Sequence, residues 1–176
     1  MNIDNLHGLA KGKDYEKERA ERKEGSADYA FTDGIYEIHG NVRYMRCSNE
    51  ECDAKFFPAV SREEAKKALP KCKDCQSIMK PHCMFFDEFY QERFYRDKSV
   101  TNFMQECDGL IVIGTALVVG MGISMVNSCI CDNVTPVVEV NLETAIDRGY
   151  NVQLLEKSET ALPCLFDELI RLKEAK

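Results

Sequence analysis

Apolar residues in the second half of the chain fall into short continuous runs that alternate with helix-spaced positions. Residues 109–113 are apolar throughout, which is typical of a strand covered on both faces of a parallel sheet. A second, mostly apolar run at residues 136–140 predicts another strand, and we expect a helix between the two that extends through residue 127. A final helix is predicted over residues 162–173, and its apolar face would consist of Leu162, Leu165, Phe166, Leu169 and Leu172.

The first half of the chain has weaker signals. Residues 35–38 are rich in strand formers and end at His39 and Gly40. Ser61 and Glu64 have the spacing of a capping box, so a helix is expected over residues 61–69. The alternation of strand, loop and helix indicates a doubly wound α/β fold, in which ligands bind at the carboxyl ends of strands. His39, the Gly114–Thr115 pair and Asn141 are all expected at such ends.

The cysteines indicate a metal site. Two pairs, Cys47-x4-Cys52 and Cys72-x2-Cys75, are separated by about twenty residues, a spacing typical of zinc modules. Four thiolates leave no coordination position for water, so the predicted zinc is structural, and His7 and His82 are not expected to be ligands. The other five cysteines are interpreted as small buried hydrophobic residues, and they are Cys83, Cys107, Cys129, Cys131 and Cys164.

Composition excludes several classes of function. The 176 residues carry a net charge of −7, which argues against a general nucleic-acid surface. The longest apolar stretch, residues 110–126, is interrupted by three glycines, so we expect no membrane span. The N-terminal residues are polar with no apolar segment after them, and nine cysteines without a secretory signal suggest a reducing compartment, which we take to be the cytoplasm. Residues 11–24 are almost continuously charged and are interpreted as a solvated surface insertion.

Taken one at a time, the candidate site residues have ordinary explanations. A single histidine is more often packed or solvated than catalytic, although the glycine after His39 would let a ligand approach closely. The Gly114–Thr115 turn could bind phosphate or ribose through backbone N–H groups at the start of the following helix, or it could be a plain strand-to-helix turn. Asn141 and Glu143 could hydrogen-bond ribose hydroxyls, which is a weaker signal still.

In order along the chain, six segments together resemble the sirtuin family of NAD-dependent protein deacylases. Residues 2–7 (NIDNLH) resemble its T-Q-N-I-D-x-L-H segment, and residues 36–40 (YEIHG) resemble E-V-H-G. The four cysteines resemble its zinc spacing, and residues 80–88 (KPHCMFFDE) resemble R-P-x-x-V-x-F-G-E. Residues 114–119 (GTALVV) resemble G-T-S-L-x-V, and residues 140–143 (VNLE) resemble I-N-x-E. The resemblance covers the chain except for the charged insertion.

The resemblance implies a role for each matching residue. His39 would be the general base that activates a ribose hydroxyl after an acyl-lysine carbonyl oxygen displaces nicotinamide from NAD. The other implied roles are nicotinamide-side contacts by Asn2 and Asp4, ribose and phosphate contacts by Gly114 and Thr115, adenosine-side contacts by Asn141 and Glu143, and an acyl-lysine channel along Met84, Phe85 and Phe86. Plain core packing would explain the last three equally well. The partner would be an acylated-lysine protein, and zinc would stay outside the chemistry.

The resemblance also implies a domain arrangement: a partial Rossmann-like parallel sheet with an inserted zinc-ribbon module. We expect residues 1–42 to form the first part of the NAD-binding domain with a charged insertion at 8–34, residues 43–82 the zinc module, and residues 83–176 the second part of the domain. In the family, the G-x-G-x-S loop and the first strand of the sheet precede the T-Q-N-I-D-x-L-H segment, and Met1 stands within that segment. A separate N-terminal half is therefore a possible partner. We therefore expect these residues alone to bind zinc and to bind NAD weakly or not at all.

Two departures from the family pattern leave other functions open. Asp87 stands at the usual glycine of F-G-E, and Ala116 replaces a serine beside the cofactor. A protein ADP-ribosyltransferase using the same site is therefore an alternative to the deacylase. A catalytically silent zinc-binding remnant or interaction module is the other alternative.

Overall fold

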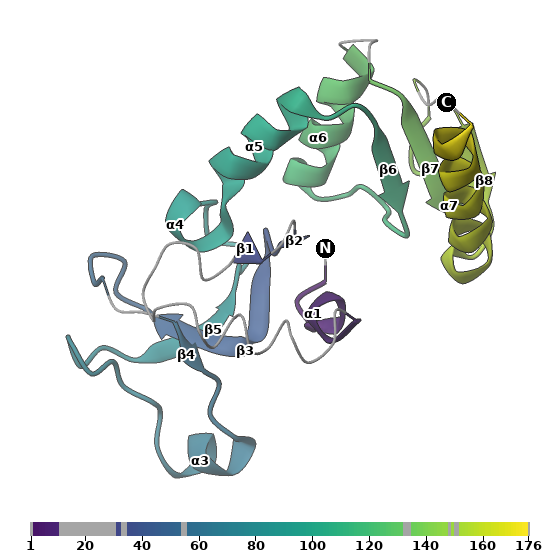
Figure 1. The fold of residues 1–176 in the computed structure, drawn as a ribbon. Helices are drawn as coiled ribbons and strands as arrows, with labels where there is room; N and C mark the ends of the chain where they lie inside the picture. Colours follow the sequence, from purple (N-terminus) through teal and green to yellow (C-terminus); the bar gives the residue numbers. More distant parts are fainter. Residues whose placement is uncertain are drawn as a thin grey trace. The chain divides into compact units, whose positions relative to one another are not determined.

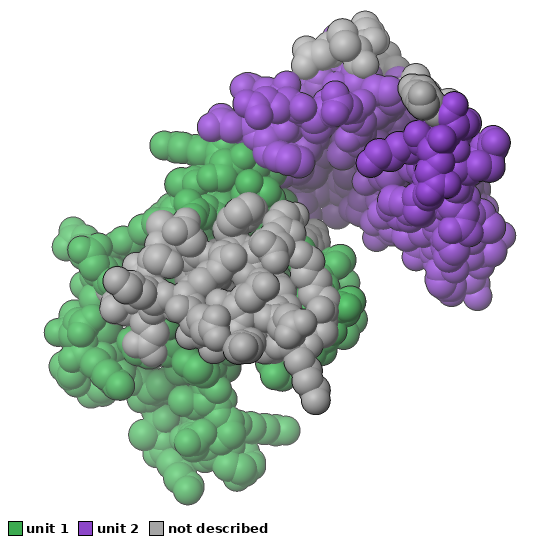
Figure 2. Space-filling model, viewed as in Figure 1, with its two compact units in different colours: residues 1–100 green, residues 101–176 purple. Residues whose placement is uncertain are grey.

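The computed structural model describes residues 2–10, 31–32, 35–53, 56–131, 135–147, 149 and 152–175. Two compact units make up the chain, Met1–Val100 and Thr101–Lys176, and each is described by itself (Figure 2). The charged residues 11–24 lie outside the described part. None of the described helices has both the length and the apolar character needed to cross a membrane.

The first unit is built around an antiparallel sheet in the order β4-β3-β5 (Figure 1). The long strand β3 (Gly40–Cys47) pairs with β4 (Phe57–Pro58) on one side and β5 (Met79–Cys83) on the other. A separate hairpin pairs β1 (Phe31–Thr32) with β2 (Ile35–Tyr36). The helices are α1 (Leu6–Ala10), α3 (Arg62–Lys67), α4 (Glu92–Tyr95) and α5 (Asp97–Glu106), and the last of these continues into the second unit.

The capping box at α3 is confirmed, but the helix is shorter than predicted. The Ser61 hydroxyl accepts from the Glu64 backbone N–H at 3.2 Å, and the Ser61 N–H donates to the Glu64 carboxylate at 2.9 Å. The helix ends at Lys67 instead of residue 69. Leu69 precedes Pro70, and the proline ring disfavours helical backbone at the residue before it.

His39 lies in a turn, which corrects its predicted place at the carboxyl end of a parallel strand. β2 ends at Tyr36 and pairs antiparallel with β1. The Gly40 N–H then donates to the Glu37 carbonyl at 2.8 Å and closes the turn that carries His39 into β3. Gly40 has φ +84°, and a Cβ there would lie 2.2 Å from the His82 carbonyl oxygen, so this reversal requires glycine.

The second unit is a parallel sheet in the order β6-β7-β8, which confirms the predicted α/β class (Figure 1). Its elements are β6 (Leu110–Ile113), α6 (Gly120–Cys131), β7 (Val137–Asn141), β8 (Val152–Leu155) and α7 (Ser158–Glu174). Val112, Val126, Cys129, Val137 and Ile146 form its core. Both predicted strands are present, and α6 runs four residues past the predicted end.

Burial departs from the sequence interpretation at α7 and at two cysteines. Leu162 and Leu165 of α7 are half-buried, whereas Phe166, Leu169 and Leu172 are exposed on the predicted apolar face. Among the five cysteines outside the two pairs, Cys83 and Cys129 are buried as expected and Cys107 is half-buried. Cys131 and Cys164 are exposed, so the prediction of burial is wrong for these two. They occupy outward positions on α6 and α7.

Candidate functional site

The two cysteine pairs come together in the first unit. Their four sulfur atoms all lie within 4.8 Å of one another, with 3.4 Å between Cys47 and Cys75 and 3.8 Å between Cys52 and Cys72. Tetrahedral zinc with Zn–S bonds of about 2.3 Å places its sulfur ligands about 3.8 Å apart. The cluster therefore fits zinc, and four thiolates would close the coordination shell.

Local backbone geometry sets up this cluster. Cys47 ends β3, and the Cys52 N–H donates to the Asn49 carbonyl at 3.2 Å in the turn that follows. Cys72 and Cys75 lie in a second turn, where the Cys72 N–H donates to the Ser77 carbonyl at 2.8 Å. Burial raises the pKa of the Cys47 thiol to about 12, whereas hydrogen bonds from Ser77 lower the pKa of Cys75 to about 6. A bound cation is what would make all four groups thiolates together.

His39 is held by its backbone and by its ring. Its carbonyl oxygen accepts from the Met84 N–H at 2.9 Å, which joins the His39 turn to the segment after β5. Its Nε2 atom lies 3.0 Å from the hydroxyl oxygen of Tyr90. The ring is half-buried, so it can meet a reactant and still keep a defined orientation.

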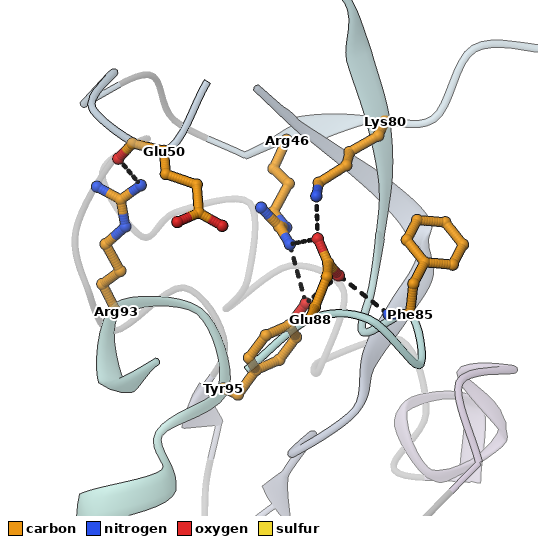
Figure 3. A network of polar contacts seen from close by, with 7 residues as sticks. All are labelled: Arg46, Glu50, Lys80, Phe85, Glu88, Arg93 and Tyr95. Atoms are coloured by element: carbon orange, nitrogen blue, oxygen red, sulfur yellow. Dashed lines mark hydrogen bonds and ion pairs between the residues drawn. The ribbon is translucent and has the colours of Figure 1, made fainter. Parts of the chain in front are cut away.

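An ion network of Arg46, Lys80 and Glu88 braces the loop that follows β5 (Figure 3). Arg46, which is 2% exposed, donates to Glu88 at 2.8 Å, and Lys80 pairs with the same carboxylate oxygen. The other carboxylate oxygen accepts from the Phe85 N–H at 3.0 Å. Burial alone would raise the pKa of Glu88, but hydrogen bonds from Lys80 and Phe85 and the charges of Arg46 and Lys80 lower it. Glu88 is therefore charged and ties the start of the loop at Phe85 to Arg46 and Lys80 of the sheet.

The predicted channel residues differ in burial. Met84 is half-buried and packs against the aromatic cluster of Tyr44, Phe56, Phe94 and Tyr95. Phe85 is exposed and Phe86 is fully exposed. Core packing therefore does not explain Phe85 and Phe86, although it does account for Met84.

The predicted nicotinamide-side residues belong to the segment that leads into α1. The Asp4 carboxylate accepts from the Leu6 N–H at 3.0 Å, and both Asn2 and Asp4 are exposed. The segment is tied to β3, because the Val42 N–H donates to the Ile3 carbonyl at 3.0 Å and the buried Asn41 amide donates to Asn5 Oδ1 at 2.7 Å. These contacts hold Asn2 and Asp4 on the same unit as His39.

In the second unit, a hollow of about 570 Å³ lies at the carboxyl ends of the parallel strands. It brings together all four residues predicted to contact the ribose, phosphates and adenosine side, namely Gly114, Thr115, Asn141 and Glu143. The loop residues Thr144 and Ala145 and the start of α7 from Lys157 to Glu159 also line it, and sequence reasoning missed them. A strand predicted at residues 152–155 would have indicated them, because the carboxyl end of β8 brings Lys157 and Ser158 to the same edge of the sheet.

Hydrogen bonds lock the Gly114 turn to the end of β7. Gly114 has φ +56°, and its N–H donates to the Val140 carbonyl at 3.0 Å. The Asn141 amide donates to the Thr115 carbonyl at 2.7 Å. α6 starts at Gly120, so residues 115–119 separate this turn from the N-terminus of the following helix. Asn141 therefore shapes the hollow through its side chain.

Glu139 supports the loop that lines this hollow. It is fully buried, and its carboxylate accepts from the Ala145 N–H at 2.7 Å and from the Gln153 amide at 2.6 Å. Burial alone would raise the pKa of Glu139, but hydrogen bonds from Gln153, Ala145, Asn141 and Ile146 lower it. The charged form is therefore the one that the fold stabilises.

We expect Glu139→Gln to lower the free energy of unfolding of the second unit by about 1.5–3 kcal/mol at pH 7, because a charged acceptor is lost. A folded-state pKa below the unfolded one contributes stability above the unfolded pKa, and this contribution disappears as pH falls through the folded value. The gap between wild type and Glu139→Gln should therefore narrow below about pH 4.5. Urea unfolding of wild type and Glu139→Gln from pH 7 to pH 3 measures this difference in the free energy of unfolding, and Glu143→Gln, at an exposed position, is the control. A difference that stays constant with pH would contradict the role of the charged Glu139 carboxylate.

Sequence comparisons identify similar proteins. A sequence model described as the Sir2 family matches residues 21–121. The chain is 32% identical over 101 residues to NAD-dependent protein deacetylase hst2 of Schizosaccharomyces pombe. This match covers 56% of the chain and 28% of that protein. It is 31% identical over 167 residues to NAD-dependent protein deacetylase 2 of Caldanaerobacter subterraneus. This match covers 92% of the chain and 54% of that protein.

Solved structures share the fold. A mutated Sir2 homologue in complex with ADP-ribose superposes with a TM-score of 0.70 at 21% identity, over 99% of this chain and 60% of the other. A Sir2 protein bound to an acetylated peptide gives 0.60 at 22% identity, over 80% and 58%. The chain thus spans between about a quarter and three fifths of the lengths of these similar proteins.

Proposed function

This chain belongs to the Sir2 family, and we propose that it supplies the NAD-binding and base-bearing parts of an NAD-dependent protein-lysine deacylase. The observation that carries the proposal is the hollow at the carboxyl ends of β6 and β7, where four of the six residues expected to contact NAD meet. In open α/β sheets, ligands bind outside the carboxyl ends of the strands. The similar proteins named as NAD-dependent deacetylases support the reaction class.

The hollow has groups suited to the ribose and phosphate parts of NAD. Gly114 lacks a side chain, and nothing lies within 4 Å of where its Cβ would be, so phosphate or ribose can approach the backbone there. Glu143 is exposed on the wall and could accept hydrogen bonds from ribose hydroxyls. Lys157 and the start of the 17-residue helix α7 are the positive groups near the hollow, whose lining also includes Glu143, Glu156 and Glu159. The groups present therefore suit ribose hydroxyls and leave Lys157 and the helix start for a phosphate.

The base would be His39. When bound, NAD supplies the ADP-ribose that receives the acyl group, and nicotinamide leaves. The part of His39 in this reaction is to accept the proton of a ribose hydroxyl, which a neutral imidazole can do near pH 7. The Glu37–Gly40 turn and the contact with Met84 hold the ring in place for this transfer.

The acyl-lysine protein would meet the chain at the loop that carries Phe85 and Phe86. Both rings are exposed beside the backbone that binds the His39 carbonyl oxygen. Apolar rings at this place suit the aliphatic stem of a lysine and its neutral acyl group, and the loop is braced by Glu88. The Sir2 structure bound to an acetylated peptide supports this substrate class.

Zinc would stabilise the first unit without entering the chemistry, since four cysteines complete its coordination. Cysteines stay unoxidised in a reducing compartment, and we propose the cytoplasm.

We further propose that activity needs a segment outside these 176 residues, supplied either on the same polypeptide or as a separate N-terminal half. The chain covers only 54% of the Caldanaerobacter relative and 60% of the ADP-ribose complex. Within the described part of the second unit, β6 pairs with β7 alone, which leaves its other edge able to accept a strand.

The test follows labelled NAD and an acetyl-lysine peptide, with the chain alone and with the N-terminal part of a Sir2 relative added. A deacylase moves the acetyl group to ADP-ribose only when both substrates are present. Label on protein without deacylation would favour the ADP-ribosyltransferase instead, a candidate kept because Ala116 lines the hollow without a hydroxyl and Asp87 is exposed in the loop. No turnover in either mixture would favour a silent zinc-binding module.

A further inference from the structure

The loop after β5 turns sharply over residues 85–88. The Glu88 N–H donates to the Phe85 carbonyl at 3.1 Å, and the Phe85 N–H donates to the Glu88 carboxylate at 3.0 Å. A carbonyl bonded to the N–H three residues later closes a β-turn, so Phe86 and Asp87 occupy its two central positions. Two hydrogen bonds between the ends of this turn therefore place two neighbouring side chains at its apex.

The side chains at and beside this turn face solvent. Phe86 is fully exposed, Phe89 is 83% exposed, and Asp87 is exposed between them in sequence. The aromatic cluster of the first unit, as far as the structure describes it, includes none of these three residues, so core packing does not account for them. Exposed apolar rings beside a charged group are typical of a surface that meets a partner.

Asp87 is the charge that this turn presents to solvent. Arg46 and Lys80 both pair with Glu88, and Figure 3 shows both cations directed at that carboxylate. The Lys80 ammonium also lies 6.0 Å from the centre of the Phe85 ring, but Glu88 already neutralises it. Among the ion pairs of the described residues, none involves Asp87. The Asp87 carboxylate is therefore available to a cation from outside the chain.

We propose that Phe86 and Asp87 select substrates in which an arginine or a lysine stands beside the acyl-lysine. This inference rests on the proposed function, in which the acyl-lysine segment meets this loop. A guanidinium can lie over an exposed aromatic ring and pair with a carboxylate through its planar fork of N–H groups. Neighbouring α-carbons are about 3.8 Å apart in the turn and in the substrate alike, so a residue next to the acyl-lysine reaches Asp87 while the lysine stem lies on the rings.

The same carboxylate works against acidic substrates. A glutamate or aspartate beside the acyl-lysine would face Asp87, and the net charge of −7 on the chain adds to the repulsion. Specificity is the difference between two affinities, so the attraction of one substrate and the repulsion of the other add together. Each exposed charge pair contributes modestly, and we expect a preference of about threefold to tenfold for arginine over glutamate at this position.

The test is competition between two acetyl-lysine peptides that differ only in an arginine or a glutamate beside the acetyl-lysine. Both are added to one mixture of the zinc-loaded chain, NAD and the N-terminal part of a Sir2 relative, and mass spectrometry gives the ratio of their kcat/KM values. The ratio should fall below about twofold in Asp87→Asn, which removes the charge and keeps a residue suited to a turn. Glu63→Gln removes one exposed charge of α3 and should leave the ratio as in wild type. Equal use of both peptides by wild type, or the same ratio in wild type and Asp87→Asn, would overturn the proposal.

Peptide binding to the zinc-loaded chain alone separates this inference from the proposed function. Nitrogen-15 NMR should show that the arginine peptide shifts the amide signals of Phe86 and Asp87 more than the glutamate peptide does, and Asp87→Asn should remove this difference. The difference should also shrink between about 0.1 M and about 1 M salt, since the screening length falls from about 10 Å to about 3 Å. If this pattern is found and no deacylation occurs, the proposed function fails and the role of Asp87 in recognition stands. Shifts that are equal for both peptides, or absent for both, would overturn that role.

Discussion

Cys72→Ala should lose its zinc and the fold of the region around the cysteine cluster. Cys72 is 1% exposed and packs with Met45, Cys47 and Met79, so the metal site and this small core are one structure. Structural zinc in small modules contributes about 10–16 kcal/mol of apparent binding free energy at pH 7, far more than a core of this size supplies. Metal analysis should give one zinc per wild-type chain and almost none for the variant, with loss of cooperative thermal unfolding of the first unit.

Cys131→Ala is the matched control, because Cys131 is an exposed cysteine of the second unit. It should keep one zinc per chain and the wild-type melting temperature. Stripping wild type with a chelator should reproduce the Cys72→Ala spectrum and leave signals of the second unit in place. A metal-free chain that unfolds at the wild-type temperature would contradict a structural role for the cluster.

His39→Ala should lower the rate of deacylation by about 10²–10⁴-fold, the usual range for loss of a general base. The side chain is half-buried and its contact with Tyr90 is at the ring, so the backbone turn closed by Gly40 should survive. The loss should therefore appear in kcat, while zinc content and NAD binding stay at wild-type values. Single-turnover measurements with saturating NAD and acetyl-lysine peptide, in the mixture that contains the N-terminal part of a Sir2 relative, report the rate of deacylation.

His7→Ala serves as the control for His39→Ala. His7 is exposed on α1 and should change the rate by less than about twofold, as expected for a surface substitution. Equal rates for His39→Ala and wild type would remove His39 from the chemistry, whereas loss of zinc or of folding would mean that the substitution reports on structure instead.

The features that the sequence predicted best are those with a local or strongly periodic cause. Two apolar runs between turn residues became β6 and β7, and the spacing of Ser61 and Glu64 became a capping box. Thiolate spacing predicted the zinc cluster because metal ligation needs those side chains whatever surrounds them. Residues predicted at the ends of β6 and β7 meet in one hollow, since parallel strands present their carboxyl ends at one edge.

The features that it missed depend on contacts between distant segments. His39 was expected at a strand tip, but it lies in a turn closed by the Gly40 N–H and the Glu37 carbonyl, where Gly40 passes against the His82 carbonyl of β5. Tyr90 gave no signal at all, since nothing in its neighbours in sequence indicates a histidine partner. The short strand β8 and the helices α4 and α5 were likewise not predicted, because none has a strong apolar period over enough residues.

The central claim is tested most directly by counting products in a mixture of this chain, the added N-terminal part of a relative, NAD and acetyl-lysine peptide. The account predicts one nicotinamide released for each lysine deacetylated, no release without the acetylated peptide, and near-complete loss of deacetylation with His39→Ala. Nicotinamide release that does not depend on the peptide, or full activity in His39→Ala, would contradict it.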